Sequence, residues 1–169
     1  VPALDPLRAL SGKVPGVRAA RYVSPHLADL SERFVIGDTA VDAPTLHAVA
    51  DDVLALVERL RADGTHEVTP TFFEVTTAMA FEMFRRARVE VAVIEVGLGG
   101  RYDATHVITP VAAAITTIGM DHQHHLGSSL GGIAGEEGAR RSRHPVRSAR
   151  KPVPFIPPPA QFAGGGGRA

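Results

Sequence analysis

The 169-residue chain contains no cysteine. This absence excludes disulfide bonds, zinc sites built from thiolates and a cysteine nucleophile, and it suits the cytoplasm, where we expect the protein to be. No apolar run approaches the length of a membrane-spanning helix, and the opening residues VPALDPLRALSGK lack the layout of a signal peptide. The formal net charge is zero, so we expect neither a nucleic acid nor a membrane as partner.

The remaining composition is that of an ordinary globular protein, with 44% hydrophobic and 21% charged residues. This length is enough for one domain with a hydrophobic core. We take the protein to be a monomer, although composition does not set the oligomeric state.

The end of the chain differs from the rest. Residues 140–169 hold seven basic residues, no acidic residue and the stretch PVPFIPPPAQFAGGGG. No hydrophobic periodicity continues beyond Glu137. We therefore expect a folded part over residues 1–136 and a disordered Pro/Arg/Gly-rich tail over residues 137–169.

The folded part alternates helical and strand patterns. Residues 43–64 and 71–87 predict amphipathic helices, with Asp42 and Thr45 both as candidate caps of the first. Residues 88–96 and 111–118 are short, almost continuously apolar runs, as in strands buried on both faces of a parallel sheet. The order predicts an α/β fold with a doubly wound, mainly parallel sheet. The expected core-facing helix positions are Leu46, Val49, Val53, Leu56, Val57, Leu60, Phe73, Thr77, Ala80, Phe81 and Phe84.

Both predicted strands end in polar residues. The first ends at Glu95 and runs into GLGG, and the second runs into TTIGMDHQHHLG, which contains Asp121 and His122. Ligands bind beyond the carboxyl ends of parallel strands, so neighbouring strands would bring Glu95 and His122 to one crevice. There they could bind a divalent cation and favour a phosphate ligand. On spacing alone, alternatives remain open: Glu95 could form a loop ion pair or cap a helix, the glycines could simply build a turn, and DHQHH could be a solvated loop or a fortuitous metal binder.

A third candidate is YVSPHLADLSERF, where Ser24 and Pro25 begin a turn and His26 follows. The serine could cap a helix, or its hydroxyl could join a metal site. In TFFE, we expect Phe72 and Phe73 to lie in the core. We expect Glu74 to be a charged residue in the first turn of the helix.

Four stretches occur in order: RYVSPHLADLSERFVI, TFFEVTTAMAF, VAVIEVGLGGRYDATHVI and ITTIGMDHQHHLGSSLGGIAGE. Together they resemble folylpolyglutamate synthase, often bifunctional with dihydrofolate synthase, in the Mur ligase superfamily. The resemblance runs from about Arg21 to Glu136. It implies a partial Mur ligase-type ATPase domain and an ATP-dependent ligase that joins L-glutamate to folate or dihydropteroate through an acyl phosphate.

The resemblance also implies roles for residues. Ser24, Glu95 and His122 match magnesium ligands, and Glu95 and His122 would serve catalysis. The implied cofactors are Mg²⁺ and ATP, with Gly97, Gly99, Gly100, Arg101 and Asp103 on the cofactor side. Ser24, Pro25, His26 and Asp121 match the neighbourhood of the substrate site, and His106 stands where the family usually has Asn.

Three departures from the family matter. The region before the first motif reads LRALSGKVPGVRAA, and its SGK lacks both the preceding glycine and a Ser or Thr after Lys13, so no ATP-binding P-loop is present there. Glu137 stands where the family has a lysine that becomes carbamylated. We also expect this chain to lack the C-terminal domain that completes the glutamate site in the family.

The tail suggests a cause for the last two departures. The family usually continues EKAGVIKPG, and inserting one base into GC-rich codons for such a segment gives a reading close to EEGARR. We hypothesise that residues 137–169 are frame-shifted translation. Reading the coding DNA in its other frames tests this, because finding no family-like continuation would contradict it.

Three functional hypotheses follow. The first is a folate-glutamate ligase chain that is inactive alone. The second is a non-catalytic remnant that binds folate or metal. The third is a small metal-dependent hydrolase using Glu95, His122 and His124. Whether dihydropteroate or a reduced folate is the substrate stays open.

Overall fold

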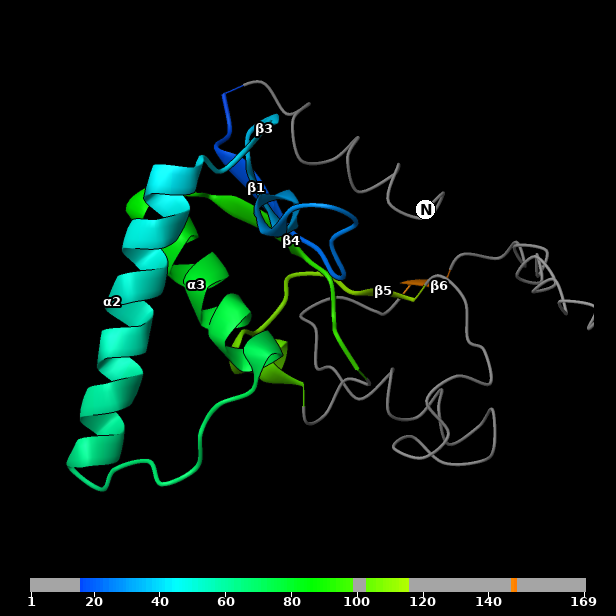
Figure 1. The fold of residues 1–169 in the computed structure, drawn as a ribbon. Coiled ribbons are helices and arrows are strands. Elements are labelled where there is room, and N and C mark those ends of the chain that lie inside the picture. Colours follow the sequence, from blue (N-terminus) through cyan, green and yellow to red (C-terminus); the bar gives the residue numbers. More distant parts are fainter. Residues whose placement is uncertain (1–15, 99–102, 116–146, 149–169) are drawn as a thin grey trace, which may run out of the picture.

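The computed structural model describes residues 16–98, 103–115 and 147–148, and its centre is a four-stranded sheet (Figure 1). The strand order is β3 (Thr39–Ala40), β2 (Phe34–Ile36), β1 (Ala19–Tyr22) and β4 (Val91–Ile94). Strand β1 is antiparallel to β2 and parallel to β4, and β2 is antiparallel to β3. The α/β class is confirmed, but the described sheet is mixed rather than mainly parallel.

The mixed character follows from the lengths of the connections. Only a short loop with one turn of helix joins β1 to β2, so the chain returns antiparallel. Between β2 and β4 the chain builds β3 and two helices, which is enough to cross back and place β4 parallel to β1.

Helices α2 (Ala43–Ala62) and α3 (Phe72–Arg86) stand side by side against the sheet (Figure 1). Asp42, one of the two predicted candidates, caps α2, and hydrogen bonds first from the Thr45 side chain and then from the Thr45 backbone N–H lower the pKa of its carboxyl. Thr71 caps α3 in a reciprocal capping box with Glu74, and the backbone hydrogen bond from Thr71 lowers the pKa of Glu74.

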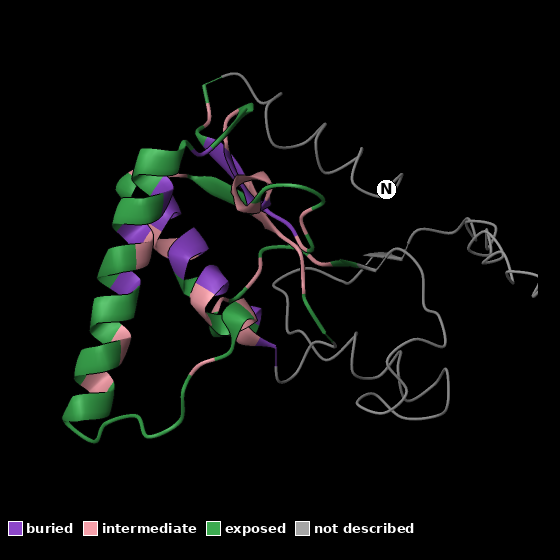
Figure 2. Cartoon of the chain, in the orientation of Figure 1, coloured by how far each residue is buried: buried purple, intermediate pink, exposed green. Residues whose placement is uncertain are grey.

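The core lies between the two helices and the sheet, where the buried positions of α2, α3 and β1 face one another (Figure 2). Stacked Tyr22 and Phe34 rings, 5.6 Å apart, form the sheet side. The predicted positions Leu46, Val49, Val53, Thr77, Ala80 and Phe84 are buried, as are Thr76, Met79 and Met83, which the predicted stripe omitted. Leu56 is 46% exposed, because it lies on the outer face of α2.

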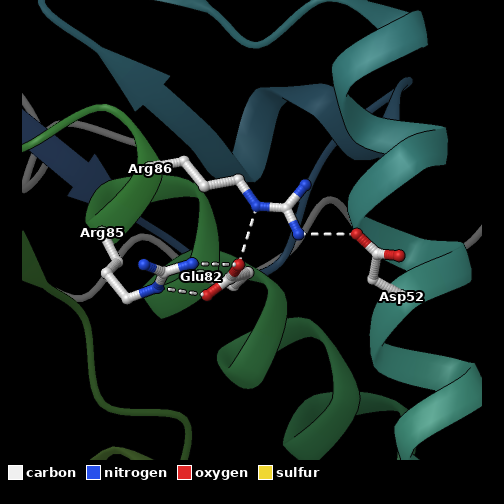
Figure 3. A network of polar contacts seen from close by, with 4 residues as sticks. All are labelled: Asp52, Glu82, Arg85 and Arg86. Carbon is white, nitrogen blue, oxygen red and sulfur yellow. Dashed lines mark hydrogen bonds and ion pairs between the residues drawn. The ribbon is translucent and has the colours of Figure 1, made fainter.

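A network of ion pairs joins the two helices on the outside of the core (Figure 3). The Arg86 guanidinium bridges Asp52 of α2 at 2.6 Å and Glu82 of α3 at 2.7 Å. Glu82 also accepts from Arg85. These hydrogen bonds, Arg85 first and Arg86 second, lower the pKa of Glu82 to about 2.

The two apolar runs read as buried strands behave differently in the structure. Strand β4 lies at the edge of the four-stranded sheet, and its Val91 is 54% exposed. The second run contributes β5 (Ala114–Ile115), which pairs parallel with β6 (Arg147–Ser148) and not with β4. Strand β6 lies inside the segment predicted to be disordered; the rest of residues 137–169 is outside the described part. No helix in the described ranges is long and apolar enough to cross a membrane.

Candidate functional site

The site begins where β1 and β4 end side by side. The two strands run parallel with Tyr22 opposite Ile94, and the Glu95 amide donates to the Tyr22 carbonyl at 2.9 Å. Ser24 is the second residue after the end of β1, and its backbone N–H donates to Glu95 Oε2 at 2.7 Å. Both residues are half-buried. The structure therefore brings two of the three sequence-predicted metal ligands together at the carboxyl end of a parallel pair.

The loop that carries Ser24 is firmly organised. The Ser24–Pro25 peptide bond is cis. A single 3₁₀ turn, η2 (Leu30–Arg33), closes the loop, and Asp29 and Glu32 form a capping box at its start. His26, half-buried, accepts a hydrogen bond at Nδ1 from Arg33 Nε at 2.9 Å. The predicted residues Ser24, Pro25 and His26 thus occupy one ordered loop.

The glycine segment after β4 is held by Asp103. Oδ2 of Asp103 accepts from the amides of Gly97 and Leu98, both at 3.0 Å. Oδ1 accepts from the amide and the hydroxyl of Thr105, so Asp103 caps the 3₁₀ turn η3 (Ala104–Val107). Asp103 and Thr105 are both buried. The carboxylate therefore closes the loop between β4 and η3 from inside.

Gly97 has a second constraint, which comes from α3. A Cβ built on Gly97 would lie 2.6 Å from Phe73 Cζ, closer than real Cβ contacts. The Phe73 ring is in turn tilted against Tyr22, with centroids 6.0 Å apart. Gly97 is therefore glycine because the Phe73 ring fills the space a side chain would need.

The remaining predicted residues have less to show. His106 is exposed on η3, and its amide donates to the Asp103 carbonyl. Gly99, Gly100 and Arg101 lie outside the described residues, as do Asp121, His122 and His124. Within the described ranges, no three His, Cys, Asp or Glu residues are grouped to hold a metal ion. The predicted third ligand, His122, stays a prediction.

Sequence reasoning missed Arg33 and Glu32, which organise the Ser24 loop. Glu32 could have been found, because Asp29-Leu-Ser-Glu32 is a capping-box pattern. Arg33 carries no sequence signal of this kind. Its contact with His26 spans seven residues and depends on how the loop closes.

The sequence is similar to those of known folate-metabolism enzymes. No family model matches the sequence. A dihydrofolate synthase/folylpolyglutamate synthase of Mycobacterium tuberculosis is 40% identical over 133 residues, covering 76% of this chain and 27% of that protein. The folylpolyglutamate synthase of Lacticaseibacillus casei is 41% identical over 120 residues, covering 70% of this chain and 28% of that protein. The chain thus spans about a quarter of the length of these relatives.

Solved structures agree with the sequence matches. A structure described as an FPGS–AMPPCP–folate complex superposes with a TM-score of 0.74 at 36% identity, covering 79% of this chain and 32% of that one. Folylpolyglutamate synthase from Mycobacterium tuberculosis, complexed with ADP and AMPPCP, superposes with a TM-score of 0.69 at 37% identity, covering 80% of this chain and 32% of that one. Over the part that these proteins share with it, the chain belongs to the folylpolyglutamate synthase/dihydrofolate synthase family.

Proposed function

We propose that the chain carries part of the catalytic centre of an ATP-dependent ligase that joins L-glutamate to folate or dihydropteroate. In this reaction ATP phosphorylates the carboxylate of the pteroate or folate. The glutamate amino group then attacks the acyl phosphate, giving an amide, ADP and phosphate. The observation that carries the proposal is the Ser24–Glu95 pair at the carboxyl end of β1 and β4, in a chain whose relatives are named for this activity.

The residues at this pair fit a magnesium ion. A serine hydroxyl and a carboxylate are hard oxygen donors of the kind Mg²⁺ prefers. The Ser24 amide fixes Glu95 Oε2, and Oε1 makes no hydrogen bond to any described residue. Bound Mg²⁺ would screen phosphate charge during transfer. Ser24 and Glu95 would hold it, with His122 as the proposed third ligand.

The protein's own groups prepare this position before any ligand arrives. Parallel pairing with β1 fixes the backbone of Glu95, and the Ser24 amide fixes its side chain. Asp103 takes up the Gly97 and Leu98 amides, so these two donors hold the loop's shape and are not free for a phosphate. A nucleotide would therefore have to bind this loop through groups other than the Gly97 and Leu98 amides. We propose Gly99, Gly100 and Arg101 for that contact.

A binding function without turnover is the second candidate, favoured by the segment before β1. In that segment Lys13 is followed by Val14 and not by Ser or Thr. Its sequence therefore does not match the phosphate-binding P-loop motif of the family. We accordingly expect this chain alone to bind pteroate or folate and to form little ADP.

Two assays on the 169-residue chain separate these functions. The first measures glutamate-dependent ADP formation with Mg²⁺, ATP and either dihydropteroate or tetrahydrofolate. The second measures equilibrium binding of each pteridine compound by fluorescence. ADP formation supports the ligase, and saturable binding without ADP supports the binding function. If the chain shows no ADP formation and no saturable binding, the proposal is contradicted. The pteridine compound that binds more tightly identifies the substrate.

A further inference from the structure

Arg33 is a buried cation without a carboxylate partner in the described part of the chain. The residue is only 6% exposed. Its described contacts are the Nε donation to His26 and the Phe72 ring, whose centroid lies 5.3 Å from Cζ of Arg33. No described Asp or Glu oxygen lies within 4.0 Å of its guanidinium. Because removing a charge from water is costly, buried cations in proteins are normally paired with an anion.

The acidic residues of the same loop are already engaged elsewhere. Glu32 accepts from the amides of Leu27, Ala28 and residue 29 at 2.9, 2.9 and 2.8 Å. These three bonds, that of Leu27 first, lower the pKa of Glu32. The side chain of Asp29 accepts from the Ser31 amide at 2.8 Å. Both carboxylates therefore hold the backbone of the loop and do not neutralise Arg33.

The contact between Arg33 and His26 also defines the donor that His26 offers. A guanidinium can only donate, so Nδ1 of His26 must present its lone pair. The neutral ring then carries its hydrogen on Nε2. Within the described ranges Nε2 makes no hydrogen bond. An N–H donor without a described acceptor and a buried cation are thus both present on the loop that carries Ser24.

We propose that Arg33 and His26 form a binding site for an anionic oxygen of a ligand, either a carboxylate or a phosphate. His26 Nε2–H would donate to that oxygen, while Arg33 fixes the ring and supplies the positive charge. The loop that presents Ser24 next to Glu95 would in this way also grip the ligand's anionic group. The source of the oxygen rests on the proposed function: a substrate carboxylate or a nucleotide phosphate.

Thermal unfolding of the full chain tests this without any step of the ligase reaction. Melting temperatures are measured in sodium phosphate and in sodium acetate, each against sodium chloride at equal ionic strength, with EDTA and no nucleotide, glutamate or pteridine. The variants are Arg33→Gln and Arg18→Gln. Arg18 is a matched control, because its charge is largely exposed and paired with Glu90. A failed ligase assay leaves this test intact.

We expect phosphate, acetate or both to raise the melting temperature of the wild type and of Arg18→Gln more than chloride does. Arg33→Gln should bind the effective anion roughly tenfold more weakly, or not at all. A phosphate-only effect identifies a phosphate ligand, and an acetate-only effect identifies a carboxylate ligand. The same rise in all three proteins, or no rise in any, would overturn the proposal.

A second measurement removes the need for a variant that folds. The ¹⁵N-labelled wild type gives an Nε–Hε signal for Arg33 and ring-nitrogen signals for His26. The proposal requires the His26 shifts of the Nε2–H tautomer and movement of both residues' signals on titration with phosphate or acetate. Signals that stay fixed while the exposed Arg18 moves would mean that the anions bind only the surface.

Discussion

Gly97 lies against the tip of the Phe73 ring, where an added Cβ would come within 2.6 Å of Cζ. We predict that Gly97→Ala destabilises the protein by about 1–3 kcal/mol, because overpacking forces the ring or the loop to move. Urea denaturation followed by circular dichroism measures the change.

A double-mutant cycle gives the control for this contact. Phe73→Leu removes the ring atoms that crowd Gly97, so adding Gly97→Ala to that variant should cost much less than adding it to the wild type. Strictly additive effects of the two substitutions would show that the alanine is disfavoured for some other reason.

Removal of the Asp103 carboxylate should open the loop between β4 and η3. Asp103→Ala leaves the amides of Gly97, Leu98 and Thr105 without their acceptor. We expect a loss of about 2 kcal/mol or more, since a buried unsatisfied donor costs about 1–3 kcal/mol. Asp103→Asn keeps one acceptor oxygen and should fall between the wild type and Asp103→Ala.

Hydrogen exchange shows whether that loss is local. The Gly97 and Leu98 amides should lose protection in Asp103→Ala, while the amide of Glu95, which donates to Tyr22, should keep it. Unchanged exchange at residues 97 and 98 would contradict the role of the Asp103 carboxylate in holding this loop closed.

Glu95→Gln should separate metal binding from folding. The glutamine carbonyl can still accept from the Ser24 amide, so the fold should persist, but the negative charge is lost. We expect Mn²⁺, as a probe for Mg²⁺, to bind roughly tenfold more weakly or worse, measured by electron paramagnetic resonance. Glu90→Gln, which removes a carboxylate outside the site, is the control, and an equal loss in both variants would argue against the proposed metal position.

The ion-pair network between α2 and α3 predicts a pH dependence. The pKa of Glu82 is lowered from 4.5 to about 2, so its contribution to stability is full above about pH 4.5 and is lost as the pH falls through about 2. The difference in melting temperature between wild type and Glu82→Gln should therefore shrink over this window. High salt should reduce the Glu82 effect. An equal pH-dependent difference in the control Glu58→Gln, which removes an exposed carboxylate from α2, would contradict this role of Glu82.

Local rules were enough to predict the two α-helices, but not the 3₁₀ turns η2 and η3. Hydrophobic periodicity and the candidate cap Asp42 predict α2. The periodicity of residues 71–87 predicts α3, which spans Phe72–Arg86. The strands were harder, because an apolar run does not reveal how many neighbours it will have. Val91 and Ala114 both lie in runs that read as fully buried, yet Val91 is at an exposed edge and Ala114 pairs in a separate ladder.

The site was predictable only as far as motifs reach. Ser24 and Glu95 are 71 residues apart, and only the family resemblance placed both at one metal before the structure showed them in contact. The partnership of Arg33 with His26 and that of Gly97 with Phe73 follow no spacing rule. They depend on the path of a loop and on the packing of a ring, which tertiary structure alone decides.

The parallel pairing of β1 with β4 has a consequence for how the molecule folds. Residues of the two strands are about seventy positions apart, with β2, β3, α2 and α3 between them, so this pairing closes a large loop and its entropy cost falls on the folding transition. The Ser24–Glu95 contact exists only once that loop is closed. A partly unfolded chain could keep its helices and still have no metal position, so metal affinity would report on the long-range topology of the protein.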